Sequence, residues 1–222
     1  KNIVVFGEAG SGKSSIINTI AQKQVAKTSN DAVGCTLKPK RYTVDISGHK
    51  FALFDTAGLN EGSEGNVPDK QAKKQLKRLL KERMRHKSPE SDGIDLLVYC
   101  VRRRNTISLP TILDAYNTVY SGTCRKEKVP IVVVVVTGFE SETHTESWWD
   151  AHRETFNSMH PAGHACVTTT QEYLGIQADL TRRVAQSSEI LRDLIVNTCS
   201  APMVDDNLPV GTWCCLPLCS MN

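Results

Sequence analysis

The sequence predicts an α/β fold built on a mostly parallel sheet with one antiparallel strand. Short apolar, β-branched runs alternate with longer segments of helical periodicity, which is typical of βαβ units. The short turn Ser47-Gly48-His49 separates two apolar runs and predicts a hairpin, and therefore the antiparallel strand. The chain has 222 residues, 40% of them hydrophobic, which is enough for one domain with a full core.

The strands are expected where the apolar runs lie, and the helices between them. The predicted strands are residues 2–6, 42–46, 50–54, 94–101, 129–136 and 164–168. The predicted helices are residues 13–22, 69–87, 108–121, 146–158 and 180–198. We expect one domain over residues 1–198. Residues 199–222 contain prolines and lack an amphipathic period, so a disordered tail is expected there.

Composition excludes several classes of function. The formal net charge is only +3, so no nucleic-acid partner is expected. The eight cysteines form no CxxC pair and no His/Cys cluster with zinc spacing, which argues against a metal finger. Reduced thiols in a cytoplasmic protein are the simplest interpretation.

Residues 7–14 read Gly-Glu-Ala-Gly-Ser-Gly-Lys-Ser and match the pattern GxxxxGK[ST] between a strand and a helix. Glycines let backbone N–H groups turn toward phosphates, and the helix N-terminus adds a positive dipole. Lys13 is expected to reach the β- and γ-phosphates, and the Ser14 hydroxyl to ligate Mg²⁺. The predicted nucleotide contacts in this loop are Gly7, Glu8, Ala9, Gly10, Ser11, Gly12, Lys13, Ser14 and Ser15. The loop therefore predicts a nucleoside triphosphate bound with Mg²⁺.

A second group of candidates follows the hairpin. Asp55 ends an apolar strand and is expected to hold Mg²⁺ through water. Asp55-Thr-Ala-Gly58 forms a DxxG pattern, in which the Gly58 amide would contact the γ-phosphate. Thr36 precedes the hairpin and is favoured over Thr28 as a hydroxyl that closes over Mg²⁺ and the γ-phosphate. The predicted metal ligands are Ser14, Thr36 and Asp55, and the predicted catalytic groups are Lys13, Thr36 and Gly58.

Together these motifs resemble the small G domains of the translation-factor-related GTPase class, including Era-like and septin- or immune-associated-type domains. The resemblance covers about residues 2–198. It implies a three-layer P-loop NTPase fold with a six-stranded sheet and five helices. It also implies a switch cycle driven by binding and hydrolysis of GTP with Mg²⁺.

The base-recognition box of that class, [NT]KxD, is altered here. The position reads Thr137-Gly-Phe-Glu140, so glycine replaces the lysine and glutamate replaces the aspartate. A glutamate can still accept two hydrogen bonds from guanine. Thr168 and Thr169 lie where the resemblance places a second base-contacting box. Guanine is favoured by the family pattern, and adenine stays open.

Hydrolysis is expected to be slow. Leu59 follows the DxxG pattern where Ras-like members carry a glutamine that positions water, and a leucine cannot donate or accept that hydrogen bond. Another group, a homodimer partner or an activating protein across the nucleotide face would then complete the site. Two alternatives to a GTP switch remain: an ATPase using the same loop, and a nucleotide-loaded interaction module with little hydrolysis.

Three surface features have both a plain and a functional interpretation. Residues 70–87 carry nine Lys or Arg residues against one acid, which favours a solvated helix face and, less strongly, contact with an anionic membrane or acidic partner. The run 102–104 of three arginines is expected to be a solvated loop. Of the adjacent Trp148 and Trp149, one should face the core, and the other should cover the base-recognition loop or mark a contact surface.

The tail has an incomplete lipidation pattern. Cys219 is fourth from the end, but Ser220 is not aliphatic and Asn222 is an unusual last residue. We therefore expect a cytoplasmic protein, with peripheral membrane contact as the less favoured location.

Overall fold

The computed structural model describes residues 1–28, 38–59, 69–85, 93–103, 109–119, 131–140, 145–169 and 178–200. Six strands in this part of the chain form one sheet: β1 (Asn2–Gly7), β2 (Lys40–Ile46), β3 (His49–Asp55), β4 (Leu96–Arg102), β5 (Ile131–Thr137) and β6 (Gly163–Cys166). Their spatial order is β2-β3-β1-β4-β5-β6. β2 pairs antiparallel with β3, and the other pairs are parallel. The predicted sheet is confirmed.

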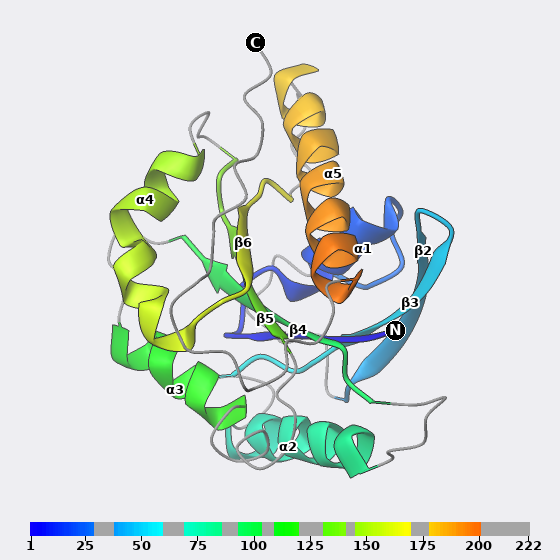
Figure 1. The fold of residues 1–222 in the computed structure, drawn as a ribbon, viewed down its shortest axis with the longest axis vertical. Coiled ribbons are helices and arrows are strands. Elements are labelled where there is room, and N and C mark those ends of the chain that lie inside the picture. Colours follow the sequence, from blue (N-terminus) through cyan, green and yellow to red (C-terminus); the bar gives the residue numbers. More distant parts are fainter. Residues whose placement is uncertain are drawn as a thin grey trace.

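Helices cover both faces of this sheet (Figure 1). The α-helices among the described residues are α1 (Lys13–Ala21), α2 (Asp69–Arg85), α3 (Leu109–Val119), α4 (Thr145–Phe156) and α5 (Ala178–Ser200). α1 and α5 pack on one face through Ile16, Ile20 and Leu191. α2, α3 and α4 pack on the other face through side chains such as Leu76 and Phe156. The predicted three-layer architecture is therefore present.

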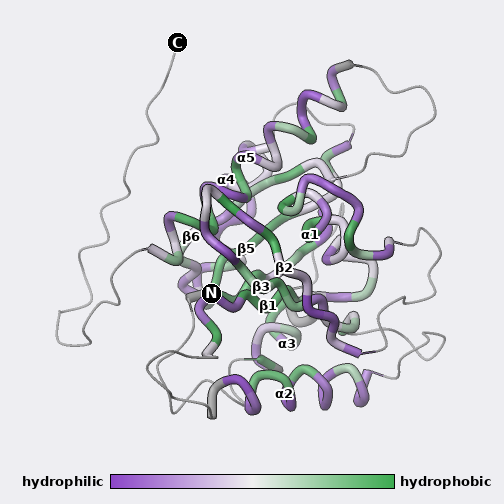
Figure 2. Tube along the Cα trace, turned by 90° about the vertical axis from the view of Figure 1, so that its right-hand side faces the viewer, coloured by the Kyte–Doolittle hydropathy of each residue, from purple (hydrophilic) through white to green (hydrophobic). Residues whose placement is uncertain are grey.

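The strands alternate between these two layers. In β1, Ile3 and Val5 belong to the core under α1 and α5, whereas Val4 and Phe6 belong to the opposite core. All four side chains are fully buried, as expected for a central parallel strand with helices on both sides. Figure 2 shows hydrophobic residues along the central strands and many hydrophilic residues on α2.

Several element ends differ from prediction. The last strand was expected to reach residue 168, but β6 ends at Cys166; the Val167 N–H still donates to the Val136 carbonyl of β5, and the Thr168 N–H donates to the Ser187 hydroxyl of α5. The helix expected over 146–158 ends at Phe156 and continues as a 3-10 turn, η2 (Asn157–Met159). α5 runs to Ser200, so the predicted domain end at residue 198 falls inside a helix. Residues 199 and 200, which were expected to begin a disordered tail, are therefore helical. The rest of that tail, residues 201–222 with the lipidation pattern, lies outside the described residues.

In the basic helix α2, residues 76, 79, 80 and 84 form an apolar stripe that helical periodicity predicts to face the sheet. Leu76 and Leu80 are buried against the sheet, and Leu79 is partly buried. The side chain of Met84 lies outside the described part of the chain. Lys73 pairs with Asp69 at 2.9 Å and with Asp114 at 2.8 Å, so part of the basic charge is neutralised within the fold. Among the described residues, no helix is long and apolar enough to span a membrane.

Candidate nucleotide-binding site

The loop between β1 and α1 closes around the Lys13 side chain. The Lys13 ammonium donates to the carbonyl oxygens of Glu8, at 2.7 Å, and Gly7, at 3.3 Å. The Ser11 N–H donates back to the Glu8 carbonyl at 3.2 Å, which tightens the same turn. Lys13 is only 8% exposed, so its charge is held in a fixed place at the start of α1. This is the loop shape that presents backbone N–H groups and one ammonium to a phosphate chain.

A hydroxyl and a carboxylate meet beside this loop. The Ser14 hydroxyl donates to an Asp55 carboxylate oxygen at 2.7 Å. β1 and β3 are neighbours with Val5 opposite Asp55, so the sheet register brings the two residues together across 41 positions of sequence. Asp55 is 1% exposed. The pairing predicted from sequence is therefore present in the fold.

The oxygen donors of Ser14 and Asp55 suit Mg²⁺, which prefers hard oxygen ligands and takes one or two from protein beside phosphates and water. No cluster of three or more His, Cys, Asp or Glu residues occurs among the described residues, so an all-protein metal cage is absent from that part of the chain. Ser14 and Asp55 thus fit a magnesium ion shared with a bound phosphate. Thr36, the third predicted ligand, lies outside the described residues.

The DxxG segment docks directly onto the phosphate loop. The Leu59 N–H donates to the Gly7 carbonyl, and the Ala9 N–H donates to the Leu59 carbonyl, both at 3.0 Å. A side chain at Gly58 would place its Cβ 2.6 Å from the Ala9 Cα, a distance that backbone atoms cannot accept. Glycine is therefore required at residue 58 by close approach of two backbones. The Leu59 side chain is fully buried in the core, which adds a structural reason why it cannot orient water.

The end of β5 is also tied to the phosphate loop. The Thr137 hydroxyl donates to the Ser11 carbonyl at 3.0 Å, and the Arg102 guanidinium donates to the Gly10 carbonyl at 3.3 Å. Gly138 has a φ of 93°, a left-handed conformation in which a lysine would be strained. A Cβ at Gly138 would lie 3.6 Å from the Cγ of Arg102, so the arginine stem occupies the adjoining space. The glycine that departs from the family box thus has a conformational cause.

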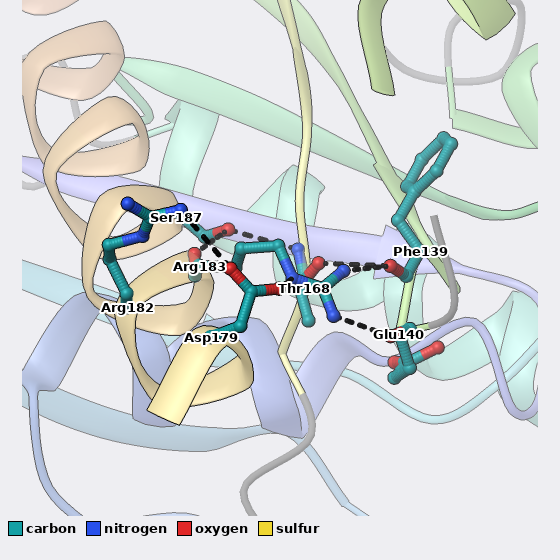
Figure 3. Close-up of polar contacts among 7 residues, drawn as sticks. All are labelled: Phe139, Glu140, Thr168, Asp179, Arg182, Arg183 and Ser187. Atoms are coloured by element: carbon teal, nitrogen blue, oxygen red, sulfur yellow. Dashed lines mark hydrogen bonds and ion pairs between the residues drawn. The ribbon is translucent and has the colours of Figure 1, made fainter. Parts of the chain in front are cut away.

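The remaining base-side candidates gather around the loop that follows β5 (Figure 3). The Thr168 hydroxyl donates to the Phe139 carbonyl at 3.3 Å. Thr168 and Thr169 are both buried, and Glu140 is partly exposed at the loop. Thr137, Glu140 and Thr168 therefore lie around one loop, and Thr169 is buried directly after Thr168.

Sequence reasoning missed two residues of this cluster. Arg183 donates to the carbonyls of Phe139, at 3.0 Å, and Glu140, at 2.8 Å. Ser187 accepts from the Thr168 N–H at 3.0 Å. Both lie within a long amphipathic helix, where an arginine and a serine carry no signal of their own, so only packing of α5 onto the loop reveals them.

The two tryptophans divide as expected. Trp149 is 9% exposed and stacks on His164, with ring centroids 4.0 Å apart. Trp148 meets the ring of Phe139 edge-on, with centroids 6.0 Å apart. The Arg103 guanidinium lies 5.5 Å from the centroid of the same phenyl ring. The loop after β5 is therefore held by aromatic packing as well as by hydrogen bonds.

Burial raises the pKa of several side chains, including two that are also affected by the charge of Asp55. Burial raises the pKa of the Cys100 thiol on β4; Lys13 lowers it and Asp55 raises it further. The thiol beside the phosphate loop therefore stays protonated at neutral pH. Burial and then the Asp55 charge raise the pKa of the Tyr42 phenol. Burial likewise raises the pKa of Cys166 to about 12.

The model of the 50S ribosome-binding GTPase family matches residues 2–137, which include Lys13, Ser14, Asp55, Gly58 and Thr137. The chain belongs to this family. Among the similar curated proteins of this GTPase family is GTPase Der of Campylobacter lari, 39% identical over 64 residues, or 29% of this chain and 14% of Der. The mitochondrial 5-taurinomethyluridine-[tRNA] synthase subunit GTPB3 of Mus musculus is 43% identical over 61 residues, or 28% of this chain and 12% of that protein. The matches thus span only about one-seventh of the curated relatives' length.

Solved structures with the same fold extend beyond the matched segment. Toc33 from Arabidopsis thaliana, in complex with GDP and Mg²⁺, is 16% identical with a TM-score of 0.59, over 90% of this chain and 84% of that one. A variant of Aquifex aeolicus Era bound to GDP.AlF4- is 14% identical with a TM-score of 0.58, over 98% of this chain and 62% of that one. At these identities the likeness concerns the fold, and it confirms the P-loop GTPase fold of this family member.

Proposed function

We propose that this GTPase-family chain is a GTP-binding switch domain that hydrolyses GTP slowly with Mg²⁺. The observation that carries the proposal is the pairing of two features: the Lys13 ammonium enclosed by the loop, and the Ser14 hydroxyl joined to Asp55. One supplies charge for phosphates and the other supplies hard oxygens for a metal beside them. The related proteins named as GTPases support the same activity.

Each residue has a role in the proposed mechanism. Lys13 would neutralise the β- and γ-phosphates, and Ser14 with Asp55 would hold Mg²⁺, which supplies positive charge against the negative charge that develops during hydrolysis. Gly58 would offer its backbone N–H to the γ-phosphate. Thr36 is proposed as the hydroxyl that closes over the metal. Leu59 is buried and supplies no water contact, so slow intrinsic turnover follows.

Guanine is proposed as the base because Glu140 lies in the loop that Thr137 ties to the phosphate site. A carboxylate there accepts from the N1–H and 2-amino groups of guanine, and adenine presents neither donor. Thr168 lies against the same loop and Thr169 follows it, and both are proposed as its second wall. An ATPase remains the alternative if Glu140 does not read the base.

Partners and location are also proposals. Dimerization is important for the GTPase activity of the chloroplast translocon components atToc33 and psToc159, which supports a homodimer or an activating protein across the nucleotide face here. One Era structure is a complex with 16S ribosomal RNA, whereas the net charge of +3 leads us to propose no nucleic-acid partner for this chain. We propose a cytoplasmic protein, with α2 as the surface for any membrane contact.

Binding of fluorescent GTP and ATP with Mg²⁺ tests the proposal. Lys13→Ala should weaken both nucleotides by roughly 100-fold, because a charge-assisted contact to phosphate is lost. Lys23→Ala, at an exposed lysine just after α1, is the matched control and should bind normally. Glu140→Ala should weaken GTP alone. Equal binding of GTP and ATP to the unaltered protein would refute the guanine proposal, and normal binding by Lys13→Ala would refute the phosphate site.

A further inference from the structure

The Arg183 side chain joins the C-terminal helix to the loop that carries Glu140. Its guanidinium donates through one terminal nitrogen to the Phe139 carbonyl at 3.0 Å and through the other to the Glu140 carbonyl at 2.8 Å. The planar guanidinium thus acts as a rigid fork that donates to two successive carbonyls, a geometry that lysine cannot provide. In Figure 3 this fork reaches from α5 across to the loop.

The Arg183 guanidinium also pairs with an acidic residue of its own helix. An Asp179 carboxylate oxygen lies 3.0 Å from the Nε of Arg183, one turn earlier on α5. The Arg183 side chain is only 18% exposed, so these charge-assisted contacts are partly shielded from water. The guanidinium therefore has a fixed orientation when it meets the loop.

A second tie from the same helix reaches the neighbouring loop. The Ser187 hydroxyl donates to the Arg183 carbonyl at 2.8 Å and accepts from the Thr168 N–H at 3.0 Å. The Thr168 hydroxyl in turn donates to the Phe139 carbonyl at 3.3 Å. Arg183 and Thr168 thus converge on one carbonyl, that of Phe139, directly before the glutamate.

We propose that Arg183 is a positioning residue for base selection, which sets the backbone at Phe139 and Glu140 so that the Glu140 carboxylate faces the purine. The inference rests on the proposed guanine-binding function and adds to it a residue that touches neither base nor phosphate. Arg183 holds the backbone of Glu140 through its carbonyl oxygen. If this contact is lost, the Glu140 carboxylate can move away from the position in which it accepts from both guanine donors. The preference for GTP over ATP therefore depends on the contacts of Arg183 with the two carbonyls, whereas the phosphate contacts do not.

The test compares two adjacent arginines of α5. Arg183→Ala removes the fork, whereas Arg182→Ala removes an exposed guanidinium that pairs with the same Asp179, at 3.1 Å, on the solvent side. Dissociation constants of fluorescent GTP and ATP are measured with Mg²⁺ for both variants, together with thermal unfolding. Arg183→Ala should lower the ATP-to-GTP ratio of dissociation constants by roughly tenfold, as expected for loss of charged hydrogen bonds, with ATP affinity unchanged. Arg182→Ala should keep the ratio.

A double-mutant cycle separates positioning from general stability. In a Glu140→Ala background, Arg183→Ala should change the ratio by less than about twofold, because the group that it positions is absent. Arg183→Lys, which keeps the charge but loses the fork, carries the same test if the alanine variant does not fold, and should also lower the ratio.

The outcomes are distinct. An unaltered protein that binds GTP and ATP equally overturns the guanine function and this inference with it. An unaltered protein that prefers GTP, with the preference kept in Arg183→Ala, overturns the inference alone. Equal loss of GTP and ATP affinity in Arg183→Ala would assign the residue a purely structural role and likewise overturn the positioning role.

Discussion

The phosphate side and the base side of the proposed nucleotide site are built in different ways. On the phosphate side, Lys13 contacts carbonyls five and six residues earlier in the same loop, and Ser14 meets Asp55 through directly neighbouring strands. On the base side, Arg183 reaches carbonyls 43 and 44 residues earlier, from a helix that packs beside the loop. The first half is thus a local motif held by the sheet, and the second depends on the packing of α5.

This difference implies that a substitution on one side of the site should leave the binding role of the other side intact. Changes on the phosphate side should weaken every nucleoside triphosphate alike, because all share the phosphates and Mg²⁺. Changes on the base side should alter the preference between bases and leave the phosphate contacts in place. Three further substitutions, from the largest expected effect to the smallest, test this separation.

Asp55→Asn should have the largest effect of the three. The change leaves the side-chain volume intact but removes the negative charge that accepts from Ser14 and would hold Mg²⁺ through water. We expect affinity for both GTP and ATP to fall roughly 10- to 100-fold at fixed Mg²⁺, as is typical when a group supporting a metal is lost. A magnesium titration of nucleotide binding measures this, with the exposed Asp193→Asn on α5 as control. A loss of affinity for GTP alone would contradict the separate roles of the phosphate side and the base side.

Leu59→Gln tests whether the missing glutamine would explain the slow turnover that we propose. The Leu59 side chain is fully buried while its backbone bridges the phosphate loop, so a glutamine would bury an amide in the core. We expect the free energy of unfolding to fall by about 1–3 kcal/mol and turnover not to rise. Urea unfolding and a phosphate-release assay measure the two effects. Leu59→Met, close in volume, should cost less than about 1.5 kcal/mol. Faster hydrolysis by Leu59→Gln would show that residue 59 reaches the nucleotide.

Ser187→Ala should have the smallest effect and act on the base side alone. It removes the acceptor of the Thr168 N–H, and we expect GTP-over-ATP preference to fall roughly two- to fivefold, in line with the loss of one neutral hydrogen bond. The adjacent Ser188→Ala is the matched control, since Ser188 is equally buried and donates to the Thr19 carbonyl of α1 instead. Both variants should lose similar stability, measured by thermal unfolding. A change of preference in Ser188→Ala as large as that in Ser187→Ala would make the effect one of general packing.

The phosphate side was predictable from sequence because it consists of one local loop and of a carboxylate placed by the default pairing of two strands. Gly7 to Ser14 form a loop whose glycines, lysine and hydroxyl have their roles at fixed spacing, and Asp55 follows a strand whose parallel pairing with β1 is the default of such a fold. The strands and helices were predicted for the same reason, since apolar periodicity reports burial on a sheet with two covered faces.

The amino-acid sequence alone therefore determined the fold class, the phosphate loop and the candidate metal pair. It did not determine why residue 138 is glycine, that Leu59 points into the core, or that Arg183 grips the loop of Glu140. Arg183 reaches that loop from α5, Gly138 lies beside Arg102 at the end of β4, and Leu59 is buried in the core under α2, α3 and α4. Each of these contacts joins residues that are far apart in the chain. A helical pattern reports which face is buried but not which backbone carbonyl an arginine on that helix will reach, and that contact exists only once the layers have packed.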